Sequence, residues 1–289
     1  MRVRKAVLPV AGFGTRVLPA SKAIPKEMLP VVDRPAIQYV VDEALEAGIE
    51  HIVFVTGRNK GAIEDYFDFA YELEDSLGQK ASKADILKSV QATRLPAGSA
   101  SFVRQQEALG LGHAIWCARD IVGREPFAIL LPDVVIKGKP SGLAQMMAAY
   151  DKVGGNVIAV DAVPEEDVSK YGVIAPKSRN GRLIEMSGMV EKPPREDAPS
   201  NLTITGRYIL QPEVFTLLED QAAGAGGEIQ LTDAMARLMD QQIFHAYEFE
   251  GSKHDCGSKI GYFEAIVAHA LDHEEIGEEA REVLSRFVS

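Results

Sequence analysis

A glycine-containing segment near the N-terminus holds the residue types that could bind a phosphorylated ligand. An apolar run of strand length leads into Gly12 and Gly14, where backbone N–H groups can approach an anion or a flat base closely because no side chain intervenes. Residues 1–34 contain seven Lys or Arg against Glu27 and Asp33, although the chain of 289 residues has a formal net charge of −11. Such a local patch is what a nucleoside triphosphate would need in order to bind an acidic protein.

Three kinds of nucleotide-binding loop can be compared with this segment. A dinucleotide-binding loop would need a third glycine at position 17, where Val17 stands, and Asp33 lies in a proline-flanked loop and does not end a second strand. The sequence contains no GxxxxGK[ST] motif, which excludes a P-loop. A GxGTR turn followed about ten residues later by Pro25-Lys26 is instead similar to the pattern of sugar-phosphate nucleotidylyltransferases.

At these residues the chain resembles the bacterial UTP:glucose-1-phosphate uridylyltransferases. Phe13 and Val17 depart from the family pattern, but neither change removes a functional group. The motifs that carry the resemblance follow one another in the family's order over nearly the whole chain: PVAGFGTRVLPASKAIPKEMLPVVDRP (9–35), QQEALGLGHA (105–114), LLPDV (130–134), KYGVI (170–174), VEKP (190–193), GEIQLTDA (227–234) and HDCGSKIGYFEA (254–265).

The resemblance implies an enzyme that transfers the uridylyl group of UTP to glucose 1-phosphate, releasing UDP-glucose and pyrophosphate, with Mg²⁺ as cofactor. In-line transfer between phosphates needs alignment and charge neutralisation, so Arg suits bidentate phosphate contact and Lys suits a point charge near the α-phosphate. The family's functional positions correspond here to catalytic Arg16, Lys26 and Lys192; nucleotide-binding Ala11, Gly12, Gly14, Thr15, Gln106 and Gly112; and sugar-phosphate-binding Gly172, Glu191 and Lys192.

Two of these motifs allow more than one interpretation. Gln106 offers an amide donor and an acceptor for the edge of uracil, although a polar residue at a strand edge would look the same. In GEIQLTDA, Thr232 before Asp233 predicts a helix cap, so we interpret this motif as mainly structural, with Glu228 as a weaker candidate for the sugar site.

Aspartates at two distant positions are the candidate metal ligands. Asp133 follows the apolar run FAILLP, and in open α/β sheets ligands gather beyond the carboxyl ends of the strands. Asp255, in the HDCGS segment, matches the position where relatives place a second metal-binding carboxylate. Either aspartate could instead complete a turn. We therefore expect Asp133, together with Asp255, to bind Mg²⁺.

The elements that must position these residues are predicted from apolar patterns. Strand-length runs alternate with helix-period segments, which predicts an α/β fold: a Rossmann-like, mainly parallel mixed sheet flanked by helices. YGVIAP and GRLIEMSGMVEKP predict a small β excursion with a turn at Asn180-Gly181. The predicted strands are 5–10, 51–56, 101–104, 127–131, 157–163, 203–209 and 243–248, and the predicted helices are 36–47, 111–120 and 142–152.

We expect one catalytic domain over residues 1–268, with a nucleotide-binding half to about residue 163 and a sugar-phosphate half over 164–268. An acidic helical tail, 269–289, is expected to follow and to take part in a homo-oligomer. The acidic balance and the lack of a long apolar run argue against nucleic-acid and membrane partners. Cys117 and Cys256 match no metal or CxxC spacing, which favours a reducing, cytoplasmic location.

Other functions stay open at this point. The phosphate-binding residues would serve a thymidylyl or guanylyl transferase equally well, because a few residues decide the base. A non-catalytic nucleotide-sugar-binding regulator would also keep the fold, although it would tolerate loss of Arg16, Lys26, Asp133 and Lys192. A dehydrogenase is the third alternative.

Overall fold

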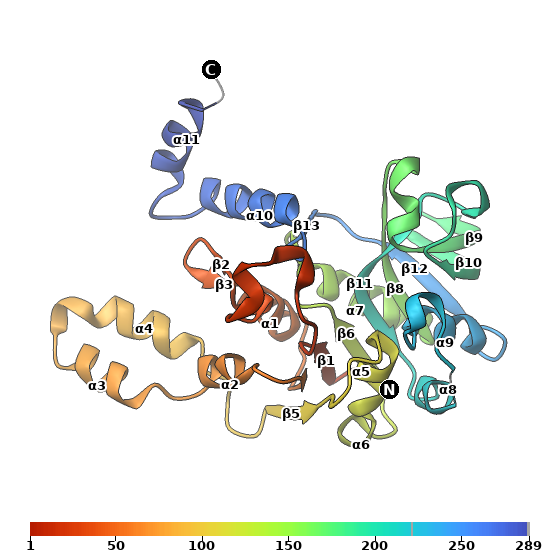
Figure 1. The fold of residues 1–289 in the computed structure, drawn as a ribbon, viewed down its shortest axis with the longest axis horizontal. Coiled ribbons are helices and arrows are strands. Elements are labelled where there is room, and N and C mark those ends of the chain that lie inside the picture. The colour runs from red at the N-terminus through yellow and green to blue at the C-terminus, as the bar shows by residue number, and fades with distance from the viewer. Residues whose placement is uncertain (221, 288–289) are drawn as a thin grey trace.

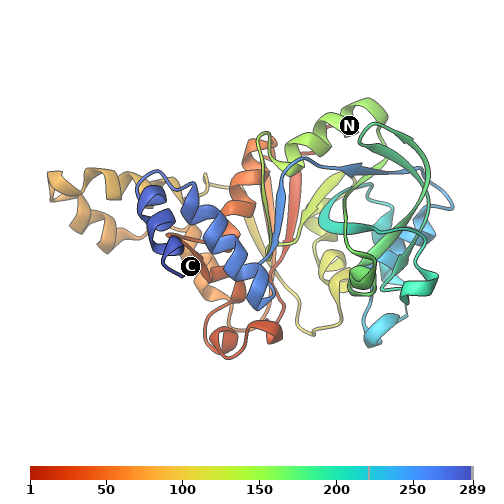
Figure 2. The same ribbon diagram turned by 90° about the horizontal axis from the view of Figure 1, so that it is seen from above.

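A nine-stranded mixed sheet forms the centre of the protein in the computed structural model, which describes residues 1–220 and 222–287. α3 and α4 lie beyond one end of the sheet, and the strands β9 and β10 form its other end (Figures 1 and 2). The strand order is β5 (Ala100–Arg104), β4 (His51–Thr56), β1 (Lys5–Pro9), β6 (Phe127–Leu130), β11 (Leu202–Leu210), β8 (Asn156–Ala162), β12 (Phe244–Glu248), β10 (Leu183–Glu191) and β9 (Gly172–Asn180).

Parallel pairing dominates the N-terminal part of the sheet. β1 is parallel to β4 and β6, and β4 is parallel to β5, so the carboxyl ends of these four strands meet at one edge. β11 is antiparallel to β6 and β8, and β12 is parallel to β8. The predicted mixed sheet with helices on its faces is confirmed. It is mainly parallel only from β5 to β6, because four of the eight neighbouring strand pairs, all involving β11 or β10, are antiparallel.

Helices cover both faces of the sheet because strand residues alternate between two cores. In β1, Leu8 belongs to a core with α1 (Ala36–Glu46) and α7 (Gly142–Val153). Val7 belongs to the opposite core, with α5 (Leu111–Cys117), α8 (Val214–Glu219) and α9 (Leu231–Leu238). Buried on both faces, the strand is apolar without interruption, which is why it was recognisable in the sequence.

The remaining elements lie around this sheet. α3 and α4 extend away from it at the left of Figures 1 and 2. Two small two-stranded sheets pair β2 with β3 and β7 with β13. The bounds are α2 (Gly61–Phe67), α3 (Tyr71–Gly78), α4 (Ala84–Ala92), α6 (Arg119–Val122), α10 (Lys259–Leu271), α11 (Gly277–Ser285), β2 (Pro30–Val31), β3 (Arg34–Pro35), β7 (Val134–Lys137) and β13 (Ser252–Asp255), with 3-10 turns at Thr15–Val17, Ala20–Lys22, Lys26–Met28, Ala81–Lys83, Glu165–Lys170, Arg195–Asp197 and Ala225–Gly227.

Some predicted boundaries differ from the structure. The helix predicted over 111–120 is two helices, α5 and α6, separated at Ala118. The β excursion is the β9–β10 hairpin, in which Asn180 pairs with Leu183 and Gly181 has a φ of 62°. The tail is helical up to Ser285, but residue 269 falls within α10. None of the helices in the described part of the chain has the length and apolarity that a bilayer crossing requires.

Gly206 generates a prediction about stability. It lies at an irregularity of β11, has a φ of 75°, and a Cβ there would lie 2.9 Å from the side chain of Leu131. Gly206→Ala should lower the free energy of unfolding by about 2–5 kcal/mol, because a left-handed backbone costs about 1–2 kcal/mol and overpacking about 1–3 kcal/mol. Urea unfolding measures this.

The matched control is Gly181→Ala, which has a similar φ but open space around the added Cβ. It should cost only the backbone contribution of about 1–2 kcal/mol. Equal losses in the two variants would contradict the close contact between Gly206 and Leu131.

Candidate functional site

The loop after β1 folds back onto the segment that carries Lys26. Gly14 has a φ of 66°, and a Cβ there would lie 3.1 Å from the Cβ atoms of both Lys26 and Ser21. The hydroxyl of Ser21 donates a hydrogen bond to the carbonyl of Gly14 at 2.7 Å. Thr15 then begins a 3-10 turn from which Arg16 extends, with 61% of its side chain exposed. Glycine at position 14 therefore brings the loop and Lys26 together.

Four charged residues that the sequence analysis singled out meet at the carboxyl edge of the sheet. Lys26 donates a hydrogen bond to Oδ2 of Asp133, at the end of β6. Arg16 lies 3.1 Å from Oδ2 of Asp255 and 3.8 Å from Oδ2 of Asp133. β13 pairs with β7 so that Asp255 lies opposite Val134, which brings the second carboxylate beside the first.

Burial and charge act against each other within this cluster. Burial raises the pKa of Asp133, but the charge and hydrogen bond of Lys26, together with the charge of Arg16, bring this pKa below its ordinary value. Burial lowers the pKa of Lys26, yet Asp133 and Glu27 raise it above its ordinary value overall. Both groups are therefore ionised at neutral pH, as phosphate and metal binding would require.

The carboxylates of Asp133 and Asp255, here called the carboxylate pair, converge on one point beside Gly257. A Cβ at Gly257 would lie 2.7 Å from Oδ2 of Asp133 and 2.9 Å from Oδ1 of Asp255, with Arg16 Nη2 at 2.6 Å. The described residues include no group of three or more His, Cys, Asp or Glu suited to a metal. The pair therefore fits a hard divalent cation whose other ligands come from phosphate and water.

The residues expected at the sugar phosphate also lie together, at the end of the β9–β10 hairpin. Gly172 pairs with Glu191 across the hairpin, and a Cβ at Gly172 would lie 3.1 Å from Oε2 of Glu191. Nζ of Lys192 lies 3.3 Å from Oε1 of Glu191, and the backbone N–H of Lys192 donates a hydrogen bond to the carbonyl of Tyr171. Lys192 has a φ of 46°, a strained conformation for a non-glycine residue and one that concentrates at functional sites.

The predicted cap at Thr232 is wrong. α9 begins at Leu231 with Gln230 at its N-cap position, and Thr232 lies inside the first turn. Its hydroxyl donates to Oε2 of Glu191 at 2.7 Å, so this motif orients a candidate sugar-site residue. A hydroxyl at a helix start suggests a cap from local sequence, whereas its partner here is 41 residues away.

Two tyrosines, the buried Tyr208 and the half-buried Tyr171, lie near charges of the hairpin and of the carboxylate pair. Burial raises the pKa of Tyr208, and the negative charges of Glu191 and Asp133 raise it further. Burial likewise raises the pKa of Tyr171, with an added contribution from Asp255. Nζ of Lys253 in β13, two residues before Asp255, lies 5.4 Å from the ring centroid of Tyr171, so β13 lies close to the start of the hairpin.

The candidates for base recognition are placed less clearly. Gln106 is exposed, whereas the neighbouring Gln105 is buried and donates through Nε2 to the carbonyl of Gly110. The N–H of Gly112 donates to the carbonyl of Ile229, so it is not available to a base in this conformation. Nothing in the amino-acid sequence indicates which of the two adjacent glutamines, Gln105 or Gln106, is buried.

A second buried ion pair was missed by the sequence analysis. Lys60 lies 2.7 Å from Oε2 of Glu27, and the exposed fractions of the two side chains are 7% and 0%. Burial raises the pKa of Glu27, while Lys60 and Lys26 lower it in part. This pair fixes the backbone next to Lys26. The adjacent Lys-Glu in PKEMLP was visible in the sequence, but Lys60 was not identifiable as its partner.

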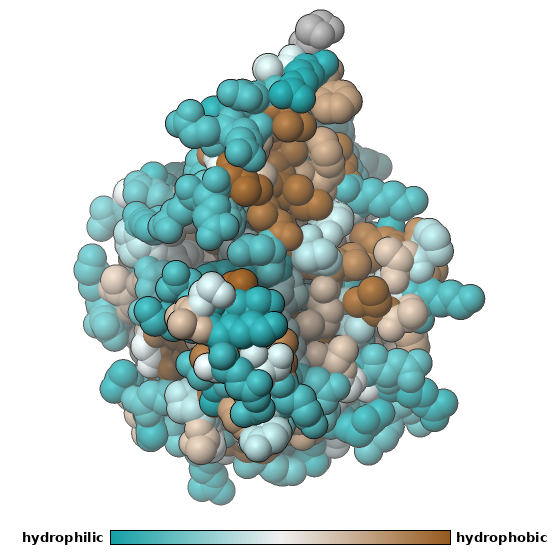
Figure 3. All heavy atoms as spheres, turned by 90° about the vertical axis from the view of Figure 1, so that its left-hand side faces the viewer, coloured by the Kyte–Doolittle hydropathy of each residue, from teal (hydrophilic) through white to brown (hydrophobic). Residues whose placement is uncertain are grey.

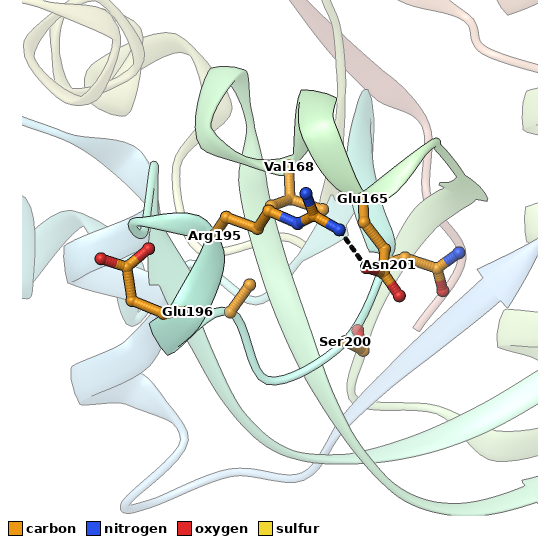
Figure 4. Close-up of a pocket in the computed structure, with 7 residues that line it drawn as sticks. Glu165, Val168, Arg195, Glu196, Ser200 and Asn201 are labelled. Carbon is orange, nitrogen blue, oxygen red and sulfur yellow. Dashed lines mark hydrogen bonds and ion pairs between the residues drawn. The ribbon is translucent and has the colours of Figure 1, made fainter.

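Two cavities help to place the site. A cavity of about 140 Å³ adjoins the N-terminal loop and is lined in part by Gly12, Lys26, Arg58 and Lys60. A larger cavity of about 530 Å³ lies along the 3-10 turns at 165–170 and 195–197 and is lined by none of the candidate residues (Figure 4). There Arg195 already pairs with Glu165, at 2.7 Å. The cationic cavity is therefore the one that belongs to the candidate site.

Comparison with known proteins agrees with this geometry. The sequence profile of the family described as nucleotidyl transferase matches residues 5–271. The chain belongs to this family. A UTP:glucose-1-phosphate uridylyltransferase of Bacillus subtilis is 50% identical over 276 residues, covering 95% of this chain and 94% of that protein. Among nucleotidyl transferases, this chain is a member of the UTP:glucose-1-phosphate uridylyltransferase group.

Solved nucleotidyl transferase structures show the same similarity. A UTP-bound UGPase from Acinetobacter baumannii is 48% identical with a TM-score of 0.90, and the match covers 98% of each chain. A UDP-glucose pyrophosphorylase complexed with UDP-glucose is 45% identical with a TM-score of 0.85, covering 92% of this chain and 98% of that chain. Nucleotidyl transferases generally use a divalent metal, which the carboxylate pair fits.

The close approach at Gly257 generates a second prediction. In Gly257→Ala, the added Cβ would occupy the point on which the carboxylate pair converges. We expect this variant to weaken binding of Mn²⁺ in the presence of UTP by at least about 10-fold, as displacement of ligand-supporting groups does in metal sites. Mn²⁺ electron paramagnetic resonance measures the bound fraction without turnover.

Gly188→Ala is the control, since its Cβ would make only an ordinary contact of 3.7 Å with Ala175. It should bind Mn²⁺ like the unaltered protein. Undiminished Mn²⁺ binding in Gly257→Ala would place the cation away from the carboxylate pair.

Proposed function

We propose that this chain catalyses transfer of the uridylyl group of UTP to glucose 1-phosphate, giving UDP-glucose and pyrophosphate. The observation that carries the proposal is the presence of two charged clusters, one of Arg16, Lys26 and the carboxylate pair and one of Lys192 and Glu191, in a chain that is 48% identical to a UTP-bound relative. One cluster suits the triphosphate and the other suits the sugar phosphate.

The proposed roles follow from charge and position. Lys26, held beside the carboxylate pair, would bind oxygens of the α-phosphate, and Arg16 would bind the phosphates that leave as pyrophosphate. The loop at Ala11, Gly12, Gly14 and Thr15 would bind the nucleotide through its backbone. Gln106 is proposed to recognise the uracil edge, while Gly112 allows α5 to pack closely on Ile229.

On the sugar side, Gly172 leaves room beside Glu191, which would accept hydrogen bonds from sugar hydroxyls. Lys192 would bind the phosphate of glucose 1-phosphate and orient its oxygen in line with the α-phosphorus. Asp133 and Asp255 are proposed to hold Mg²⁺, which supplies charge neutralisation of the phosphate oxygens when bound.

The decisive experiment measures pyrophosphate release from each of UTP, dTTP and GTP with glucose 1-phosphate. We expect turnover that depends on Mg²⁺, stops in excess EDTA and is fastest with UTP. Full activity in EDTA, or faster turnover with dTTP or GTP, would contradict the proposal. No release with any nucleotide would favour a nucleotide-sugar-binding regulator.

We further propose that the protein is a homo-oligomer of the cytoplasm, with the two halves of the chain, about 1–163 and 164–268, serving nucleotide and sugar phosphate. Large hydrophobic side chains are exposed along α10, at Ile260 and Phe263, and at Val283 of α11. Figure 3 shows a hydrophobic strip over these C-terminal helices. A surface of this kind is typical of a contact between protein chains.

Sedimentation analysis tests the oligomer. The unaltered protein should sediment above the mass of one chain, and Phe263→Glu should shift it toward the monomer, because a buried charge at an interface is costly. Tyr71→Glu, an equally exposed aromatic position on α3, should leave association unchanged. A monomeric unaltered protein would contradict the proposal.

A further inference from the structure

Arg207, in the middle of β11, is fully buried and uses every donor of its guanidinium group. Nε and Nη2 donate to the two carboxylate oxygens of Glu43, at 3.1 and 2.8 Å. Nη1 donates to the carbonyls of Leu131 and Gly206, both at 3.2 Å, and Nη2 also donates to the carbonyl of Val134, at 2.6 Å. All five N–H groups thus have acceptors, which is what a buried guanidinium requires.

Two of these acceptors flank Asp133. Leu131 directly follows β6, and Val134 begins β7. One guanidinium group therefore binds the backbone on both sides of Pro132-Asp133. The N–H of Leu131 donates to the carbonyl of Gly206, and the N–H of Val134 donates to the carbonyl of Leu131. The turn that carries Asp133 is therefore attached to β11 at each end.

Glu43 fixes the orientation of the guanidinium in turn. Its Oε1 also accepts a hydrogen bond from the N–H of Leu143 at 2.8 Å, which ties α1 to the start of α7. A side chain at Gly142 would lie 3.2 Å from the same oxygen. The position of the Glu43 carboxylate is thus fixed by α1, which carries it, and by α7, which donates a hydrogen bond to it.

A buried ion pair is an expensive way to fill a core, because apolar residues of similar volume often give equal or greater stability. Apolar residues could not, however, donate to the carbonyls of Leu131 and Val134. The arginine therefore supplies directional hydrogen bonds that orient the backbone of this turn. A displacement of about 1 Å in a reacting constellation can reduce the rate about 100-fold.

We propose that Arg207, oriented by Glu43, is a positioning residue that sets the location of Asp133 through the carbonyls of Leu131 and Val134. This inference rests on the proposed function, since it takes Asp133 as a residue of that site. The side chain of Arg207 is fully buried, so this role is exerted through the turn that carries Asp133.

The experiment compares Arg207→Lys with the unaltered protein in turnover and in hydrogen exchange. Lysine keeps the charge but cannot reach all four partners, because its ammonium has three donors at a single point. We expect kcat to fall by at least about 10-fold with KM for glucose 1-phosphate within about 3-fold, as for a lost transition-state interaction. The amides of Leu131, Asp133 and Val134 should exchange faster without any ligand. So should the amide of Cys256, which donates to the carbonyl of Asp133 at 2.7 Å.

The matched control is Asn156→Ala. Asn156 is equally buried and joins β8 to Gln211 and Gln242, away from the turn of Asp133. It should lower stability while leaving kcat per folded molecule and exchange at 131–134 unchanged. If both variants lose rate only in proportion to the fraction unfolded, Arg207 has a purely structural role and the proposal is overturned.

Glu43→Gln keeps the test valid should Arg207→Lys fail to fold. It retains the shape of the carboxylate but replaces one acceptor oxygen by an NH2 group, so it removes the negative charge and at least one of the hydrogen bonds from Arg207. It should reproduce the fall in kcat and the faster exchange in milder form. Normal kcat in folded Arg207→Lys or Glu43→Gln would overturn the proposal. A lack of turnover in the unaltered protein would instead overturn the proposed function, and the exchange measurement would still decide whether Arg207 holds the turn.

Discussion

Opposite charges share a largely buried space at the carboxyl edge of the sheet, and much of the surrounding structure serves to make this arrangement stable. Lys26 and Asp133 each have only 15% of their side chains exposed. Removing two charges from water is costly, so the pair persists only where its geometry is good and the remaining hydrogen-bonding groups are satisfied. The pKa of Asp133 lies below its ordinary value, because attraction to Lys26 and Arg16 outweighs the effect of burial.

Each member of this central pair is supported by another buried pair behind it. Glu27, next to Lys26, contacts Lys60, while Arg207 binds the backbone around Asp133 and contacts Glu43. The support is uneven: Oε1 of Glu27 is buried without a hydrogen-bond partner among the described residues, whereas the donors of Arg207 are all used. The unpaired oxygen near Lys26 therefore lowers stability, whereas the fully paired Arg207 holds the backbone around Asp133 in place.

Local patterns in the sequence were sufficient for most strands of the sheet. The strand predicted at 51–56 matches β4 because an unbroken apolar run must be buried on both faces. Asp133 was a candidate because it follows a buried strand, whereas the roles of Arg16 and Lys26 were implied by the resemblance to a family. Thr232 and Arg207 were not interpreted correctly or not found, because their roles come from partners 41 and 164 residues away. Spacing along the chain carries no information about such contacts, and only the fold reveals them.

The order of strands has a consequence for the protein while it is being made. β12 lies between β8 and β10, and β13 follows it with Asp255 at its end, so both the sheet and the carboxylate pair depend on residues 244–255, which follow all other strands. Until that segment leaves the ribosome, the edges of β8 and β10 that receive β12 have no partner and can pair wrongly with other strands. The acidic net charge of the chain opposes such encounters between nascent molecules. Chemical competence therefore requires β12 and β13 to have been synthesised, and the same segment completes the sheet.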